Sequence, residues 1–452
     1  MPFSEVTFAS SNCKKMKKTK LYVAITLVLT QTISWAQDTI VISKKEIINK
    51  AADKNLQIKI ADQSFKAAQA DYRQSNALFL PSITASHTGI STTNPLMAFG
   101  SKLNQEILTQ ADFNPALLNN PARTQNFATK IEILQPLINI DGYYGRQAAK
   151  AKMEAFQFQT ERTKEYLELE INKAYMQLQL AYKAVTVLNK ANTTALSNLQ
   201  VVNNYFKQGM LQKTDVLTVE VRVNEIKNQL QYAKSNVQNA SDYLAFLINE
   251  DLSNSVFKPI EALENSINTI ATNPLLSGDR KDLLAMDQSV KAYEKMAQSS
   301  QMNFLPRLNA FGSYELYDKN ILGMGASGYL VGAQLSWNVF DGYKSIGKME
   351  KAKAEHQKSS IENQQYKAQS QIELNKTNRQ LKDSENKVGL AQLALQQSEE
   401  AYRIRNNRFQ QGLEKTSDLL QAATQMSQKE LELLQAVFEY NITKEYLQFL
   451  TK

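Results

Sequence analysis

The chain has 452 residues, a mean hydropathy of -0.41 and 43% hydrophobic residues, which excludes a polytopic helical membrane protein because such a protein needs several apolar runs of about 20 residues. A membrane β-barrel stays open, since its strands alternate polar and apolar residues and leave no long apolar run. The charged fraction of 21% and the net charge of +8 are accompanied by abundant large apolar residues, so a wholly disordered chain is excluded as well.

The N-terminal segment is typical of a secretory signal. Three lysines stand directly before an apolar stretch: Lys17, Lys18 and Lys20. The stretch, Leu21–Ile33, is too short to span a bilayer as a helix, and the small residues that a signal peptidase reads follow it and end at Ala36. We therefore expect a signal peptide over residues 1–36. If translation begins at Met16, residues 1–15 come from a mis-assigned start codon.

Loss of this segment changes both the charge and the cysteine content. It removes five lysines and one glutamate, which lowers the net charge from +8 to +4. A balance this small does not favour a nucleic-acid partner, and export argues against one. The only cysteine, Cys13, is lost with the segment, so the mature chain has no thiol for disulfides, catalysis or metal binding.

The chain between Pro81 and Asp141 has the period of two that is typical of amphipathic strands. Its first part places four polar residues on one face: Ser82, Thr84, Ser86 and Thr88. Its last part places four largely apolar residues on one face: Phe127, Thr129, Ile131 and Ile133. We expect a strand pair at about residues 80–140, which Pro81 leads into and which Asp141 and Gly142 connect to the following helix.

An Asn- and Pro-rich stretch, residues 91–126, separates these two strands. It is about 25 residues longer than the corresponding stretch between Tyr317 and Gly328. We interpret it as an external loop, and binding of a surface partner is the alternative.

Two stretches of the chain lack the residues that break helices. From Arg146 to Gln208 there is neither proline nor glycine, and from Lys348 to Gln411 the only breaker is Gly389. Helices of about 60 residues would be on the order of 90 Å long, several times the diameter of a small domain. We therefore expect two helices that are too long for the interior of one globule.

After Gly209, apolar residues recur every seven positions. One row comprises Val216, Val223, Leu230, Val237 and Leu244. The other row comprises Val219, Ile226, Ala233, Ala240 and Leu247. Such rows indicate coiled-coil seams, and the polar residues between them indicate faces in contact with water.

Motifs of the first half return in the second half. At an offset of 203, Tyr205–Gly209 corresponds to Arg408–Gly412, and Asp215–Leu217 corresponds to Asp418–Leu420. Phe-Leu-Pro occurs at 79–81 and 304–306, and Asp-Gly-Tyr occurs at 141–143 and 341–343. This order indicates a duplicated unit of helix, strand pair, long helix, glycine turn and returning helix.

The duplication suggests the domain organisation. The expected parts are a signal peptide at 1–36, a first repeat at 37–250 with its turn near 209, a linker at 251–279, and a second repeat at 280–452 with a strand pair at about 305–340 and a turn near 412. In the second repeat, Pro306 leads into the strands, and Asp341 with Gly342 connects them to the helix.

Only four amphipathic strands occur in the chain, which is too few to close a barrel. A bilayer tolerates no open sheet edge, so we expect several copies to share one barrel. Two copies would supply eight strands and three would supply twelve, and the polar inner faces favour the wider barrel. Aromatic residues near the strand ends suit the membrane interface: Tyr317, Trp337 and Phe340.

Motifs that carry catalytic chemistry are missing. The sequence has no P-loop, nucleophile elbow or glycine-rich dinucleotide turn. Its two histidines, His87 and His356, lie far apart without other ligands nearby, so we expect no metal, no cofactor and no enzymatic activity.

The duplicated order of Phe-Leu-Pro, Asp-Gly, Phe-x-Gln-Gly and a following Asp resembles the TolC family of bacterial outer-membrane efflux and secretion channels over essentially the whole mature chain. The resemblance implies a mainly α fold with a small β part, in which long antiparallel coiled-coil helices form an α-barrel and four strands per chain contribute to a trimeric transmembrane β-barrel. It further implies a homotrimer in the lipid of the outer membrane of a Gram-negative bacterium, with its helices in the periplasm.

The resemblance also implies partners and a transport role. The turns at Gly209 and Gly412 would face a periplasmic adaptor protein fed by an inner-membrane pump of the RND or ABC type. The trimer would be a passive exit duct for drugs, small molecules or proteins. The alternative is a periplasmic adaptor protein with helical hairpins, which usually has one hairpin between globular domains, whereas this chain has two hairpins and lipid-compatible strands.

In the family, acidic residues after the turn ring the periplasmic entrance, and Asp215 and Asp418 occupy that position here. The alternative is that both are ordinary first-turn acids, with Thr214 or Thr416 helping to cap the helix. Gly209 and Gly412 likewise are either plain helix-terminating residues or part of the adaptor contact. Two residues depart from the family's pattern. Gln421 argues against a doubled acidic ring, and Glu414 argues against the family's entrance salt links.

Overall fold

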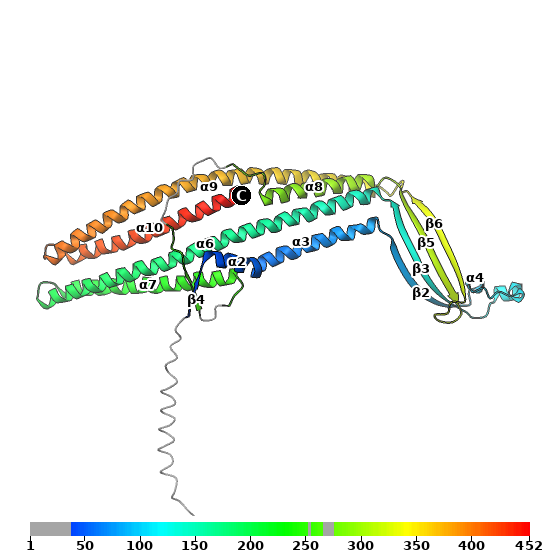
Figure 1. The fold of residues 1–452 in the computed structure, drawn as a ribbon, viewed down its shortest axis with the longest axis horizontal. Coiled ribbons are helices and arrows are strands. Elements are labelled where there is room, and N and C mark those ends of the chain that lie inside the picture. The colour runs from blue at the N-terminus through cyan, green and yellow to red at the C-terminus, as the bar shows by residue number, and fades with distance from the viewer. Residues whose placement is uncertain (1–37, 252–254, 265–274) are drawn as a thin grey trace, which may run out of the picture.

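The structure is a computed structural model that describes residues 38–251, 255–264 and 275–452. The signal peptide expected at residues 1–36 and part of the expected linker lie outside the described residues. Long helices form one end of the elongated molecule and a small sheet forms the other (Figure 1).

The helices carry most of the chain. Their bounds are α2 Lys44–Lys54, α3 Leu56–Gln74, α6 Ile140–Lys207, α7 Lys213–Leu247, α8 Lys281–Met302, α9 Lys344–Gln410 and α10 Thr416–Thr451. The two long helices predicted from the absence of breakers are confirmed, since α6 has 68 residues and α9 has 67. Among the residues that the structure describes, none of the helices is both long and apolar enough to cross a membrane.

Four helices lie side by side at every level of the helical part. Near the sheet, α3 contacts α6, α6 contacts α8, and α8 contacts α9. Toward the other end, α7 contacts α6, α6 contacts α10, and α10 contacts α9. The long helices α6 and α9 therefore run through both levels, while the shorter helices follow one another end to end.

Polar side chains join these shorter helices at their ends. The Asn55 side chain precedes α3 and donates from Nδ2 to the carbonyl of Leu247, the last residue of α7, at 2.7 Å. The Arg280 side chain precedes α8 and donates to the carbonyl of Leu450, near the end of α10, at 3.4 Å. Because the last carbonyls of a helix have no partner within the helix, both junctions satisfy backbone groups that would otherwise be buried without a hydrogen bond.

The predicted coiled-coil seams are confirmed. Most of the heptad positions of α7 are buried, and so are their counterparts in α10: Val216, Val219, Val223, Ile226, Leu244, Leu419, Met426, Tyr440 and Leu447. Leu230 is half-buried. The hairpins are thus stabilised mainly by apolar contacts along one side of each helix.

A small parallel sheet lies at the level of the helix junctions. Strand β1 (Asp38–Ile42) pairs with β4 (Ser255–Pro259), which falls in the segment expected to be a linker. Ile42 and Phe257 are fully buried against α6, where Tyr175 donates its hydroxyl to the carbonyl of Ile42. This pairing ties the start of the described chain to the segment between the two halves.

The four predicted strands are confirmed as β2 (Ser82–Thr92), β3 (Thr124–Ile138), β5 (Arg307–Asp318) and β6 (Ala326–Ser336). They form one antiparallel sheet in the order β2-β3-β5-β6, so β2 and β6 are its edges.

The register separates an apolar face of the sheet from a polar face. Ile83 lies opposite Ile133, and Ile131 lies opposite Tyr314, on the apolar face. On the polar face Lys130 lies opposite Glu315 and forms an ion pair with it at 3.5 Å.

One of the aromatic residues expected near the strand ends, Tyr317, differs from expectation. Tyr317 lies two residues from Glu315 and donates its hydroxyl to that carboxylate, so it belongs to the polar face and not to the face suited to lipid. Trp337 lies near a strand end as expected, because it directly follows Ser336, the last residue of β6, and its indole donates to the carbonyl of Phe304 at 3.0 Å.

Candidate functional site at the hairpin tips and the helical cleft

Both hairpins end in the same glycine turn. Gly209 has φ 75° and Gly412 has φ 72°, the left-handed conformation that glycine adopts without steric cost. After α6, the amide of Met210 donates to the Tyr205 carbonyl at 2.9 Å, and after α9 the amide of Leu413 donates to the Arg408 carbonyl at 2.9 Å. These are Schellman turns, which satisfy the last carbonyls of each long helix.

Replacing Gly412 with alanine is expected to destabilise the second tip by about 1–2 kcal/mol, because a Cβ is disfavoured in the left-handed conformation. The amides of the turn should then exchange with solvent about 5–30 times faster, measured by hydrogen exchange. The matched control is Gly389→Ala in the middle of α9, which should stabilise its helix by about 1 kcal/mol. Equal protection of the turn in Gly412→Ala and in the unaltered protein would contradict the prediction.

Asp215 lies in the first turn of α7, but neither expected threonine caps its helix. The N-cap of α7 is Gln212, whose amide donates to the Asp215 carboxylate at 3.1 Å. The N-cap of α10 is Lys415, and Thr416 is buried without a side-chain hydrogen bond among the described residues. The expectation of threonine caps is wrong because both helices begin earlier than it requires. Helix α7 begins at Lys213 and α10 begins at Thr416, so Thr214 and Thr416 already lie inside the helices.

The second tip contains an ion cluster that the sequence reading missed. Glu414 accepts from Arg405 Nη1 and from Arg408 Nε, both at 2.9 Å, and only 12% of its side chain is exposed. Arg405 also lies 3.8 Å from Asp418. The sequence feature that predicts this cluster is a pair of basic residues, Arg408 and Arg405, one and two helical turns before Gly412, with an acid, Glu414, two residues after it. A closed turn at Gly412 brings these side chains together.

The first tip is apolar at the corresponding positions. At the offset of 203, Arg405 corresponds to Val202, and Glu414 corresponds to Leu211. Val202 is fully buried and Leu211 packs against the same cluster. Since Asp215 has no ion pair within the described part of the chain, its carboxylate differs electrostatically from that of Asp418.

The two tips also contact each other. The Tyr205 hydroxyl donates to the carbonyl of Gln410 at 3.0 Å, and the ring of Tyr205 lies 5.8 Å from that of Phe409. Tyr205 therefore links the end of α6 to the end of α9.

The two Asp-Gly pairs, both expected as strand-to-helix connectors, differ from each other. Asp341 and Gly342 lie between β6 and α9, and the Asp341 carboxylate accepts from the amide of Ser345 at 3.2 Å. Asp141 and Gly142 instead lie in the first turn of α6, because the Asn139 side chain caps the helix by accepting from the Gly142 amide.

The residues that lead into the strands lie where expected. Pro81 directly precedes β2, and Pro306 directly precedes β5. Arg307, the first residue of β5, binds the Asp141 carboxylate through Nε at 3.0 Å and so ties the second half to the start of α6.

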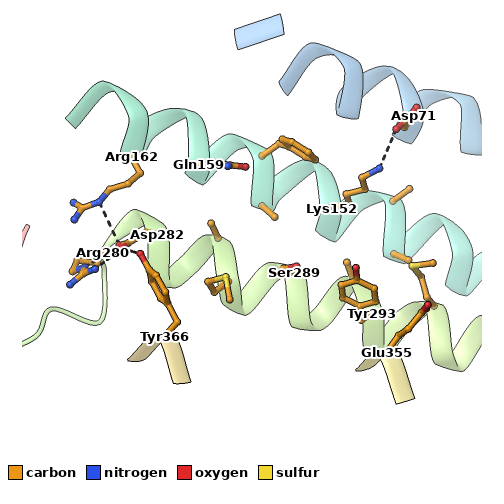
Figure 2. Close-up of a pocket in the computed structure, with 18 of the residues that line it drawn as sticks. Asp71, Lys152, Gln159, Arg162, Arg280, Asp282, Ser289, Tyr293, Glu355 and Tyr366 are labelled. Carbon is orange, nitrogen blue, oxygen red and sulfur yellow. Dashed lines mark hydrogen bonds and ion pairs between the residues drawn. The ribbon is translucent and has the colours of Figure 1, made fainter. Parts of the chain in front are cut away.

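A cleft of about 1310 Å³ lies along α6, α8 and α9. Figure 2 shows Arg162, Arg280, Asp282 and Tyr366 pointing toward one another at one end of this cleft. At the other end, Lys152 of α6 lies 3.6 Å from Asp71 of α3. Small and apolar residues line the wall between them, for instance Ala148, Ala285 and Met286.

The charged end of the cleft is a clamp on the junction between α10 and α8. Asp282 accepts from Arg280 Nε at 3.0 Å and from the Tyr366 hydroxyl at 2.6 Å, and Arg162 Nε lies 3.6 Å away. Arg162 also donates to the carbonyl of Phe449 at 3.2 Å and lies over the ring of that residue. Both arginines therefore hold the last turn of α10.

The charges in the clamp stabilise one another. Burial alone would raise the pKa of Asp282, but the hydrogen bonds from Arg280 and Tyr366 and the charge of Arg162 outweigh burial and hold that pKa at about 2. Burial and the hydrogen bond to Asp282 raise the pKa of Tyr366 to about 12. Within the described ranges, no group of three acidic, histidine or cysteine side chains could hold a metal ion.

Two long helical hairpins joined to a four-stranded amphipathic sheet, whose edge strands have no partner within the described residues, are the features of a membrane-channel subunit. Residues 47–250 and 275–451 match the sequence profile described as outer membrane efflux protein, and the chain belongs to this family. The predicted TolC-like fold, the predicted outer-membrane location and the predicted role as the outer-membrane channel component of an efflux system are thereby confirmed.

Several solved structures share the fold of this chain. The outer membrane protein VceC from Vibrio cholerae is 16% identical, with a TM-score of 0.75 over 90% of this chain and 96% of that one. A membrane protein from Pseudomonas aeruginosa is 15% identical, with a TM-score of 0.79 over 93% and 96%. The CmeC outer membrane channel of Campylobacter jejuni is 16% identical, with a TM-score of 0.76 over 90% and 85%. No curated protein matches the chain in sequence.

Proposed function

We propose that three copies of the chain form a passive, non-enzymatic exit duct through the outer membrane and the periplasm for drugs, small molecules or proteins. The observation that carries the proposal is the sheet, whose edge strands β2 and β6 have no partner on their outer sides within the described chain and whose faces differ in polarity. Pairing β6 of one copy with β2 of the next removes every open edge, as a bilayer requires.

Apolar surface on the helices supports the same arrangement. Large apolar side chains face water on α7 and α9 of a single copy, although these helices are otherwise polar outside their seams: Val221, Phe246, Ile372, Leu390 and Ile404. Packing α7 of one copy on α9 of the next would bury these residues and complete a ring of helices.

Cysteine cross-linking tests the trimer, since the mature chain is expected to lack cysteine. Val221 and Ile404 both lie about two helical turns from the tip, so Val221→Cys combined with Ile404→Cys should yield covalent trimers on oxidation. The matched control pairs Ile404→Cys with Ser235→Cys, about four turns higher on α7, and should yield none. A soluble periplasmic monomer without detergent-resistant trimers would end the channel proposal.

We further propose that the tips dock a periplasmic adaptor protein, which connects the duct to an inner-membrane pump of the RND or ABC type. The two turns project farthest from the sheet, and their chemistry differs, with an apolar first tip and an ionic second tip. An adaptor can therefore distinguish the two hairpins. Cross-linkers placed at Met210 and Leu413 should capture the adaptor, and capture from neither position would remove the docking role.

A further inference from the structure

The long connection between β2 and β3 is itself folded. Its elements are α4 (Pro95–Asn104), the short helix η2 (Gln110–Phe113) and α5 (Pro115–Asn119). We call residues 93–123 the outer segment. By contrast, β5 and β6 are joined by residues 319–325 alone. In Figure 1 α4 lies at the ends of the strands that are remote from the long helices.

Side-chain contacts hold the outer segment together. Lys102 Nζ lies 2.7 Å from Asp112 Oδ1, and the other oxygen of this carboxylate accepts from the amide of Thr109 at 2.8 Å. The rings of Phe99 and Phe113 pack edge to face with centroids 5.6 Å apart. A connection with these internal contacts is a folded element rather than a flexible tether.

One side of α4 packs against the sheet. Ala98, Ser101 and Gln105 are buried, and because they are three and four residues apart they lie on the same side of the helix. Helix α4 contacts both β3 and β6, and the buried strand residues at this end are Thr124, Asn126 and Ala326. The small side chains on both surfaces allow close approach.

The register identifies which face of the sheet α4 covers. Asn126 lies two residues from Ala128, which pairs with Tyr317, and Tyr317 pairs in turn with Ala326. These residues share the face that carries Lys130 and Glu315 farther along. Gln105 fixes the helix there, because its Nε2 donates to Asn126 Oδ1 and to the carbonyl of Gln125, both at 2.8 Å. Helix α4 therefore covers the polar face.

The remaining surface of the outer segment exposes several large apolar side chains. Six large side chains face water in one copy: Leu96, Met97, Leu103, Ile107, Phe113 and Leu117. Leu96 is 81% exposed. Helix α4 reaches β6, the edge strand at which the proposed trimer joins its copies, so this apolar surface continues directly from the contact between copies.

We propose that the outer segment is a lid on the outer mouth of the channel, which narrows the lumen and limits the size of what passes. Helix α4 extends over the lumen side of the sheet, and its apolar residues meet those of the two other copies above the mouth. The lid rests on the proposed trimeric channel, because only there does the polar face line a lumen.

Access from outside to a cysteine on the polar face tests the lid. Ser86 lies in the middle of β2, opposite Lys130, so Ser86→Cys places a thiol below the lid. Intact cells carrying this variant are treated with a small sulfonated maleimide or with a maleimide on a long polyethylene glycol chain. The test compares the full outer segment with a form in which residues 95–121 are replaced by a Gly-Ser connection as long as residues 319–325. Because the reagents approach from outside, the state of the periplasmic tips does not affect the result.

The expected result is that the small reagent labels both forms, whereas the large reagent labels only the shortened form. Gln105→Ala, which removes the anchor to β3 and keeps the segment, should show partial loss of protection. Equal labelling of both forms by the large reagent would overturn the lid. Lys319→Cys, in the short outer connection, is the control for exposure and should react with both reagents. Failure of Lys319→Cys to react, or of Ser86→Cys to react with the small reagent, would overturn the proposed channel itself.

Discussion

Arg280→Ala is expected to lower the free energy of unfolding by about 3 kcal/mol, the lower end of the range for breaking a buried ion pair by removing one partner. Only 3% of the Arg280 side chain is exposed, and its removal leaves Asp282 without both hydrogen bonds from the guanidinium and the Leu450 carbonyl without a donor. The lower end applies because Arg162, 3.6 Å from Asp282, still compensates part of the charge. The readout is the midpoint of the loss of helical circular dichroism on heating the purified trimer.

Lys281→Ala is the matched control. Lys281 adjoins Arg280 and pairs with Glu161 at 3.4 Å, but this pair is partly exposed, so its loss should cost about 0–1 kcal/mol. Equal midpoints for Arg280→Ala and Lys281→Ala would show that the clamp does not stabilise the junction. A double-mutant cycle of Arg280→Ala and Asp282→Asn should give a coupling energy different from zero, because Arg280 and Asp282 are in contact.

The clamp also predicts how stability depends on pH. The pKa of Asp282 is about 2 in the folded protein, below its ordinary value of 3.8, so the charged form is favoured by folding. Its contribution is therefore present above about pH 4 and is lost as the pH falls from about 4 to about 2. In Asp282→Asn this part of the acid-induced loss should disappear, and an unchanged acid profile would contradict the assignment.

Local patterns in the sequence predicted most of the architecture. The long helices, the glycine turns and the four strands depend on residue spacing and on the positions of proline and glycine, which act within a few residues. Because the two halves repeat, the elements of the second half could be predicted from those of the first. Asp141 and Asp341 nevertheless differ in position, because only the first half has a capping asparagine, Asn139.

Contacts between distant segments could not be predicted in this way. Strand β1 is five residues long, and its parallel partner β4 follows more than two hundred residues later, so no local signal marks the pair. Arg162, Arg280 and Asp282 appear in the sequence as ordinary charges on solvated helices, and only the end-to-end stacking of α10 and α8 brings them into one buried cluster.

At the tips, the structure distinguishes two acids that the sequence treats as equivalent. Asp418 lies 3.8 Å from Arg405, which already offsets its charge, whereas Asp215 has a backbone amide as its partner and no ion pair among the described residues. In the proposed trimer, Asp215 would contribute three uncompensated carboxylates near the entrance. We therefore expect Asp215, more than Asp418, to set the preference of the channel for cations.

Asp215→Asn is expected to lower the ratio of potassium to chloride permeability about tenfold, the low end of the enrichment of counter-ions by a charged constriction. Asp418→Asn should have a smaller effect, because Arg405 already offsets the charge of Asp418 and stays paired with Glu414 after the substitution. Reversal potentials in planar bilayers under a salt gradient provide the measurement, and high salt should diminish the difference by screening. Strong block by multivalent cations is not expected, since Gln421 takes the place of a second acid. Unchanged reversal potentials in the Asp215→Asn and Asp418→Asn double variant would show that neither carboxylate lines the conducting path.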